Sequence, residues 1–348
     1  METSHLSTSS SEKTFCLKGA QAPKAFVASV LLILLIEIAL HLSEDKLPEP
    51  VIWGSGETSV KVAQVIKRAD ENKNKALDIL IAGPSHASLG ISPQAMKSVN
   101  GCNDLQIYNG GLNGRTYSVV NFVSKNVYEP LLRPSIIVLT ASPVILNGNN
   151  QWMERNSSEF FAAPMPKALL SKSPERNWRI FLNEHIFLFK YRRREWKLSE
   201  GYLNGKKVVD AFGYHAVEGV YDENSRRELL EGPHPYLGIM NAFTFDGPSV
   251  ESFVEMITRL QAIGCTVIVV NMPFRDALLE ISDTGSEDYQ AYLNALHALS
   301  SQLGFTWLDY QENMTFTDDD FRDVDHLNTT GAIRLSEGLA QDVLQIAF

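Results

Sequence analysis

Short apolar runs that end at glycine, proline or another turn residue constrain the fold of this chain more than any other feature of its sequence. They are residues 76–82, 105–108, 134–140, 265–271 and 305–308. Segments with helical spacing lie between most of these runs. Runs of this length are typical of buried strands, and strands that alternate with helices form a parallel sheet covered on both faces. We therefore predict an α/β fold of three layers, α/β/α, with a central parallel sheet.

The N-terminal part of the chain has a different composition. Residues 1–23 are polar and rich in serine and threonine, which predicts a disordered tail. Residues 25–42 are almost continuously apolar, and about 18 such residues is the short end of what spans a bilayer. Lysines precede this segment and carboxylates follow it, namely Lys13, Lys18, Lys24, Glu44, Asp45 and Glu49. This bias predicts a transmembrane helix at 24–42, with a cytoplasmic N-terminus and the main domain in a periplasmic or other extracytoplasmic space.

Other interpretations of the apolar segment remain open. Glu37 lies inside it, and a carboxylate within the bilayer costs a few kcal/mol unless water or a partner relieves it. A cleaved signal peptide and a buried core helix are the alternatives, although no small-residue cleavage site follows the segment.

The remaining chain divides into a linker and one large domain. Residues 43–59 contain prolines and glycines and predict a linker, and residues 60–348 form the predicted α/β domain. At about 144–245 no clean strand–helix alternation is visible, which predicts an inserted cap over the strand ends. Aromatic and arginine side chains gather at 178–196 within this insertion. They could lie on a membrane surface, stack on sugars, or pack on the domain with the arginines in water.

Composition argues against two classes of function. The net charge is -10, whereas sequence-independent nucleic-acid binding needs clustered lysine and arginine, so we expect no nucleic-acid partner. The chain has 3 cysteines and no Cys-x-x-Cys pair, so the sequence gives no support for a zinc or redox site. We expect neither a metal nor a cofactor.

A serine and a histidine far apart in the chain carry side chains that acyl transfer needs. Ser85 follows a predicted strand in Gly83-Pro84-Ser85, where a turn would expose its hydroxyl, although serines also stabilise ordinary turns. His326 follows Asp323 by three positions, so this carboxylate can orient the imidazole as a general base. Helix capping is the alternative for this acidic segment, and a metal site would need more ligands than are visible.

A glycine loop at 109–116 follows the second predicted strand and reads Asn-Gly-Gly-Leu-Asn-Gly-Arg-Thr. The backbone N–H of Gly114 could face an oxyanion, or the glycines could form a tight turn into a helix. The spacing fits neither the Walker pattern nor the dinucleotide fingerprint. Because ligands of a parallel sheet bind beyond the carboxyl ends of its strands, we expect Ser85, Pro143 and Asn271 to converge with this loop.

These motifs resemble the sequence blocks of the SGNH hydrolase superfamily, also called the G-D-S-L esterases and acetyltransferases. Block one is similar to Gly83-Pro84-Ser85 with proline in place of aspartate, block two to 109–116, and block five to Asp323, His326, Asn328 and Gly331. The resemblance covers roughly 76–143 and 249–348. It implies an SGNH-hydrolase fold with flavodoxin-like strand order.

The resemblance also implies roles for individual residues. Ser85 would be the nucleophile, His326 the general base and Asp323 its orienting carboxylate. The backbone N–H groups of Ser85 and Gly114 would bind the oxyanion.

Block three of the family is not present. The family has Gly-x-Asn-Asp after the third strand, where this chain has Thr-Ala-Ser142-Pro. A second side-chain oxyanion donor is therefore missing or replaced, and Ser142 or Asn147 could substitute for it. His86, Asn109 and Asn271 are the predicted substrate-binding residues.

A membrane-anchored subgroup is a closer match. Gly90-Ile-Ser-Pro93 and Leu327-Asn-Thr-Thr-Gly-Ala332 resemble its pattern, and so does the N-terminal apolar segment. The resemblance is to cell-envelope polysaccharide O-acetyltransferases and to the D-alanyl transfer protein of teichoic acid synthesis. It implies transfer or hydrolysis of a small O-acyl group, with acetyl as the expected group, on a surface glycan, beside a multi-pass membrane acyltransferase. A non-catalytic scaffold and a glycan-binding module are the rival hypotheses.

Overall fold

The computed structural model describes residues 22–43, 56–71, 75–150, 155, 157–158, 160–161, 186–188, 209–231 and 242–347. Nearly all of the predicted disordered tail, most of the predicted linker and much of the predicted insertion lie outside these residues. The aromatic and arginine cluster at 178–196 also lies outside them, apart from 186–188.

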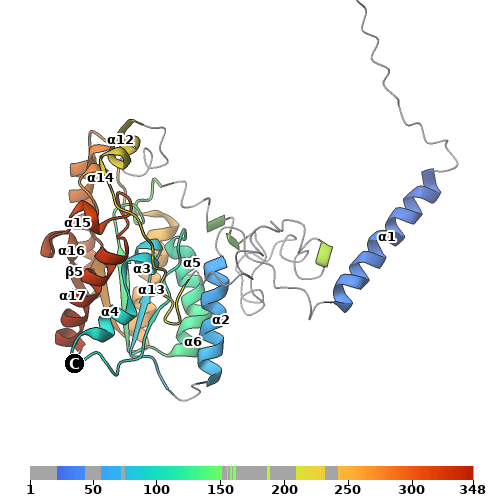
Figure 1. Cartoon of the computed structure of the whole chain (residues 1–348), viewed down its shortest axis with the longest axis horizontal. Helices are drawn as coiled ribbons and strands as arrows, with labels where there is room; N and C mark the ends of the chain where they lie inside the picture. The colour runs from blue at the N-terminus through green and yellow to red at the C-terminus, as the bar shows by residue number, and fades with distance from the viewer. Residues whose placement is uncertain are drawn as a thin grey trace, which may run out of the picture.

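A 5-stranded parallel sheet forms the centre of the fold (Figure 1). Its strands are β1 (Ile79–Ala82), β2 (Ile107–Asn109), β3 (Ile136–Ala141), β4 (Thr266–Asn271) and β5 (Thr306–Asp309). They lie in the order β2-β1-β3-β4-β5, and neighbouring strands are parallel throughout. This is the flavodoxin-like order, so the prediction of an α/β fold with a central parallel sheet is confirmed.

Helices cover both faces of the sheet, which explains why β1 and β3 are buried along their whole length. Within the described residues, the helices of the domain are α2 (Gly56–Glu71), α3 (Ser85–Gly90), α4 (Pro93–Ser98), α5 (Tyr117–Val123), the π-helical η2 (Ser124–Tyr128), α6 (Glu129–Leu132), α12 (Glu223–Glu231), α13 (Gly247–Ala262), α14 (Ala277–Glu280), α15 (Gly285–Leu303), α16 (Tyr310–Asn313), the 3-10 helix η4 (Asp318–Asp320) and α17 (Thr329–Ala347). The last helix, α17, packs on α3 and α4, while α13 packs on α5. In Figure 1, α4 and α17 lie on one side of the strands and α2, α5 and α6 on the other.

The strand order places a topological switch point between β1 and β3, where ligands of such sheets bind. Gly83 makes the turn out of β1 there. Its φ is +149°, and a Cβ would lie 2.3 Å from Thr140 Oγ1 at the end of β3. Only glycine avoids both problems, so this position lets the chain pass directly from β1 into α3.

The structure describes parts of the predicted linker and of the predicted insertion. The predicted linker ends too late, because α2 already begins at Gly56. Within the predicted insertion, residues 209–221 run past the strand ends. The Phe212 carbonyl accepts the N–H of Asn109 at 2.8 Å, and the Val217 carbonyl accepts that of Thr329 at 2.9 Å.

Among the described residues, one helix is long and apolar enough to cross a membrane: α1 (Ala22–Leu42). The segment Pro23–Leu42 has a mean hydropathy of 2.5 and is not buried by the domain. A signal sequence would meet the same criterion, so both the membrane anchor and its orientation stay predictions. The Glu37 carboxylate within α1 accepts the backbone N–H groups of Phe187 and Leu188, the latter at 2.9 Å.

Candidate active site

Ser85 is the first residue of α3, directly after the turn that leaves β1. Pro84 occupies the N-cap position of this short helix. A helix leaves the N–H groups of its first turn without intrahelical partners, so the Ser85 N–H is positioned to meet a developing negative charge. Ser85 is largely buried and keeps 8% of its surface exposed.

His326 reaches Ser85 from the other end of the chain. Its Nε2 lies 2.8 Å from Ser85 Oγ, although the two residues are 241 positions apart. Its Nδ1 lies 2.8 Å from Asp323 Oδ1, which also accepts the backbone N–H groups of Asp325 at 3.2 Å and His326 at 2.9 Å. The fold therefore brings the predicted Ser85, His326 and Asp323 together, in an arrangement that allows proton transfer from the hydroxyl to the ring.

The sequence prediction missed a second carboxylate on His326. Asp325 Oδ1 lies 3.0 Å from His326 Nδ1, and Asp325 Oδ2 lies 3.5 Å from His86 Nε2. The Asp325 side chain is 3% exposed, against 40% for Asp323. The rings of His86 and His326 stack with centroids 4.9 Å apart and planes at 21°. The available sequence signals were the second aspartate before His326 and the histidine that follows Ser85.

The charges around His326 favour its protonated form. Burial opposes a positive charge on the ring, but the carboxylates of Asp325 and Asp323 outweigh burial and raise the pKa of His326 well above its usual range. Burial alone would raise the pKa of Asp325, yet His326 and His86 beside it hold that pKa well below the usual range. The site thus favours an imidazolium–carboxylate pair, which is the state that forms when Ser85 gives up its proton.

The glycine loop packs directly on α3. At Gly111 a Cβ would lie 2.4 Å from the backbone nitrogen of Ser88, and the N–H of Leu112 donates to the Gly83 carbonyl at 2.8 Å. Among the described residues, the N–H of Gly114 has no hydrogen-bond acceptor, and this glycine is partly exposed. The loop therefore offers a free donor at the position where the sequence predicts one.

Asn109 and Asn271 hold strand ends and loops of the fold together. Both are fully buried. The Asn109 amide donates to the carbonyls of Ala87 and Ile91, and its oxygen accepts a backbone N–H of the glycine loop. The Asn271 amide bonds to Asp309 and to two tyrosine hydroxyls. A position at a strand end does not determine exposure, and the contact of these two residues with substrate stays a prediction.

His86, the third predicted substrate-binding residue, is buried as well. It is 3% exposed, so it faces Asp325 and His326 and not the solvent. Its direct contact with substrate is not supported, although it does belong to the site.

The candidates for a second side-chain oxyanion donor have structural partners. Ser142 is 2% exposed, and its Oγ accepts the N–H of Ile145 at 3.4 Å in the turn after β3. Asn147 Oδ1 accepts the backbone N–H groups of Asn149 at 3.0 Å and Thr244 at 3.2 Å. Neither residue contacts Ser85 within the described part of the chain, so this role stays a prediction for both.

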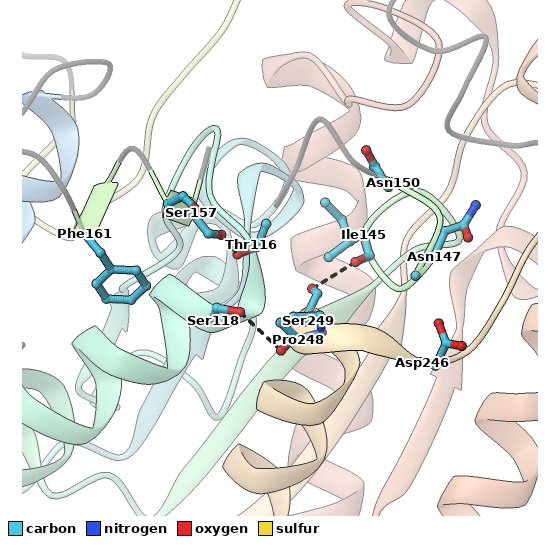
Figure 2. A pocket seen from close by; sticks show the side chains of 12 residues that line it. Thr116, Ser118, Ile145, Asn147, Asn150, Ser157, Phe161, Asp246, Pro248 and Ser249 are labelled. Carbon is cyan, nitrogen blue, oxygen red and sulfur yellow. Dashed lines mark hydrogen bonds between the residues drawn. The ribbon is translucent and has the colours of Figure 1, made fainter. Parts of the chain in front are cut away.

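Asn147 lines a pocket of about 220 Å³ between the starts of α5 and α13 (Figure 2). The hydroxyl groups of this pocket mostly bond to the protein. Ser118 donates to the Pro248 carbonyl at 3.2 Å, and Ser249 donates to the Ile145 carbonyl at 3.0 Å. Ser85 and His326 are not among the residues that line it. The pocket is therefore separate from the proposed reacting groups.

A buried ion pair supports α3 and the glycine loop. Lys61 of α2 is fully buried and lies 2.9 Å from Glu57. Its ammonium group also donates to Ser88 Oγ at 3.0 Å and to the Gly111 carbonyl. Glu57 accepts the Ser88 hydroxyl, and its Oε2 lies 2.9 Å from His215 Nδ1. The sequence analysis missed this network because a lysine in an amphipathic helix is usually exposed to solvent.

Among the described residues, His86, Asp325 and His326 form a group that could hold a metal ion, with ligand atoms within 4.8 Å of one another. An ion bound to all three would compete with Asp323 and Ser85 for the ring of His326. The contacts among these side chains already account for the cluster, and the reaction proposed below does not require an ion.

No protein-family model matches the chain, and no curated protein matches it. Solved structures do resemble it, 23 chains in all. A putative acylhydrolase from Bacteroides fragilis is 13% identical over 81% of this chain and 96% of that one, with a TM-score of 0.36. A carbohydrate acetylesterase from Sinorhizobium meliloti is 12% identical over 78% and 99%, with a TM-score of 0.38. A mutant of an acetyl-xylooligosaccharide esterase from a Geobacillus species is 9% identical over 78% and 94%, with a TM-score of 0.39. Identities and TM-scores this low leave the function to be judged from the site itself.

Proposed function

We propose that this protein is a membrane-anchored serine enzyme of the SGNH type that transfers or hydrolyses a small O-acyl group. The observation that carries the proposal is the 2.8 Å contact between Ser85 Oγ and His326 Nε2, with Asp323 2.8 Å from the other ring nitrogen. Hydroxyl, imidazole and carboxylate in this order form a site that acyl transfer uses on several unrelated folds.

In the proposed reaction, His326 Nε2 takes the proton of Ser85 as Oγ bonds to the acyl carbon of the ester. The carbonyl oxygen becomes an oxyanion, which the N–H groups of Ser85 and Gly114 receive. When the carbonyl re-forms, the bond to the leaving alcohol breaks and His326 gives that alcohol its proton. Water or an acceptor hydroxyl then attacks the acyl group on Ser85 by the same steps, and Ser85 regains its proton.

The substrate we propose is an O-acylated glycan of the cell surface, with acetyl as the acyl group. The limited exposure of Ser85 suits a small acyl group. The apolar α1 would hold the domain at a membrane, and the charges on either side of it favour an extracytoplasmic domain. A multi-pass acyltransferase as donor partner belongs to the proposal through the sequence resemblance alone.

Substitution of Ser85 tests the proposal. We expect full-length Ser85→Ala to lose hydrolysis of 4-nitrophenyl acetate by about a thousandfold or more, because it removes the hydroxyl that lies 2.8 Å from His326 Nε2. The matched control is Ser98→Ala, whose hydroxyl only donates to the Ala95 carbonyl at the end of α4. Undiminished hydrolysis by Ser85→Ala would remove Ser85 from the mechanism.

The anchor is tested by extraction from membranes. A chain held by α1 stays with the membrane pellet in alkaline carbonate and is released by detergent, because apolar helix burial does not depend on surface charge. Release of the full-length chain by carbonate alone would contradict the anchor.

A non-catalytic partner of an envelope machinery is the second candidate. The observation that favours it is that, among the described residues, no hydrogen bond joins Ser142 or Asn147 to Ser85, and the loss of one oxyanion donor typically costs about a hundred- to a thousandfold in rate. Slow hydrolysis that still depends on Ser85 supports the enzyme. A wild-type chain that hydrolyses no activated ester favours the partner.

A further inference from the structure

Two buried groups in the site have no part in the reaction described so far: Asp325 and His86. Both side chains are 3% exposed. They face each other, with 3.5 Å between Asp325 Oδ2 and His86 Nε2, and both contact His326. Among the described residues, Nδ1 of His86 has no hydrogen-bond partner, so the polar contact of His86 there is with Asp325.

Burial makes the Asp325 charge more effective than its distance suggests. Asp323 is slightly closer to His326 Nδ1, at 2.8 Å against 3.0 Å, but its side chain is 40% exposed and water screens it. The interaction between two charges grows as the effective dielectric falls, so the buried Asp325 acts more strongly on the ring. A carboxylate this buried is costly unless donors or opposite charges meet it, and His86 lies beside its second oxygen.

We infer that Asp325 and His86 are positioning residues: His86 holds the Asp325 carboxylate against His326, and that carboxylate stabilises the imidazolium that forms when Ser85 is deprotonated. Asp323 accepts the hydrogen bond that orients the ring, so the two carboxylates have different tasks. The inference rests on the proposed function, because both concern the same proton transfer.

Several other charged groups near the site are paired with one another. These pairs are Arg334 with Asp320, Arg275 with Asp318, and Lys61 with Glu57, which also contacts His215. Among the described residues, Asp323 and Asp325 are therefore the carboxylates that face His326, and His86 is the imidazole that faces it.

The inference predicts a distinctive pH dependence. His326 must be neutral to accept the proton of Ser85, so the rate falls as the pH falls through the pKa of His326. An anionic Asp325 favours the imidazolium, so Asp325→Asn moves this acidic limb to lower pH. The same change leaves the imidazolium of the transition state less stabilised, so the maximal rate falls. A merely structural role would lower the plateau and leave the limb in place.

The test is the pH profile of kcat/KM for 4-nitrophenyl acetate, with the full-length chain in detergent. For Asp325→Asn we expect the limb about one pH unit lower and the plateau about tenfold lower. His86→Phe keeps a stacking ring without the N–H and should shift the limb in the same direction, while His86→Gln restores a donor and should reverse part of the shift. Asp319→Asn removes an exposed charge from the same segment and should change neither.

A double variant shows whether His86 acts on His326 by way of Asp325 or independently of it. In the Asp325→Asn background, His86→Phe should add no further shift of the limb. An unmoved limb in Asp325→Asn, or a His86→Phe shift of equal size with and without Asp325, overturns the inference. If Asp325→Asn does not fold, the His86 variants decide. An acidic limb in His86→Phe identical to that of the wild type overturns the inference. A limb at lower pH in His86→Phe, partly reversed in His86→Gln, supports the inference.

The failure of the inference can be told apart from that of the proposed function. An active wild type with an unmoved limb in the variants counts against the inference alone. A wild type that hydrolyses no ester counts against the proposed function, and the NMR titration of ¹⁵N-labelled His326 then measures the same shift without turnover. A titration of His326 unchanged by Asp325→Asn overturns the inference in that case too.

Discussion

Two carboxylates of unequal exposure share one imidazole in this site. Asp323 takes the hydrogen bond of His326 Nδ1 and also caps the backbone of the loop, so it sets the orientation of the ring. Asp325 is buried and lies close to the same nitrogen, so its field is less screened. The ring that meets Ser85 is therefore both oriented and electrostatically supported before any substrate binds, which is what pre-organisation for proton transfer requires.

At this scale the sequence predicts the groups that lie in short motifs. Ser85, Asp323 and His326 could be found because a serine after a strand and an Asp-x-x-His spacing each have a chemical reason. Asp325 and His86 could not be assigned, because the burial of a carboxylate depends on how α3 packs on a loop from the other end of the chain. The same limit applies to Asn109, because no local sequence pattern reports that it is fully buried.

At the scale of elements, the ion pair of Lys61 and Glu57 joins α2 to α3 and to the glycine loop. Burial raises the pKa of Glu57, but Lys61, His215 and Ser88 outweigh burial and lower it to about 2. Because this pKa is depressed in the folded state, the contribution of Glu57 to stability is present above the unfolded value near 4.5 and is lost as the pH falls towards 2. The Glu57 carboxylate is thus charged at neutral pH, while burial lowers the pKa of Lys61 against the opposing effect of Glu57.

We expect Lys61→Met to lower the free energy of unfolding by about 3–5 kcal/mol, because it leaves the Glu57 carboxylate buried without its cation. The double variant Lys61→Met with Glu57→Leu removes both charges and should recover a large part of that loss. Urea unfolding of the full-length chain, followed by circular dichroism, measures both. A single variant no less stable than the double variant would show that the two charges do not depend on each other.

At the scale of the whole molecule, the strand order decides where chemistry can occur. A parallel sheet could be predicted because the strands are short apolar runs between helices. The strands lie in the order β2-β1-β3-β4-β5. It places the turn after β1 at the switch point, and α17 packs on α3, so the segment before α17 carries His326 to Ser85. The contribution of residues 144–245 was not predictable in the same way, because that stretch has no periodic pattern to interpret.

The most direct test of the central claim, that folding makes Ser85 a nucleophile through His326, is the mapping of a fluorophosphonate adduct by peptide mass spectrometry. The probe bonds only to an activated hydroxyl, so we expect one adduct, on the peptide that contains Ser85. We expect its rate of formation to fall by about a thousandfold or more in His326→Ala. An adduct at another residue, no adduct at all, or labelling of Ser85 at an unchanged rate in His326→Ala would contradict the claim.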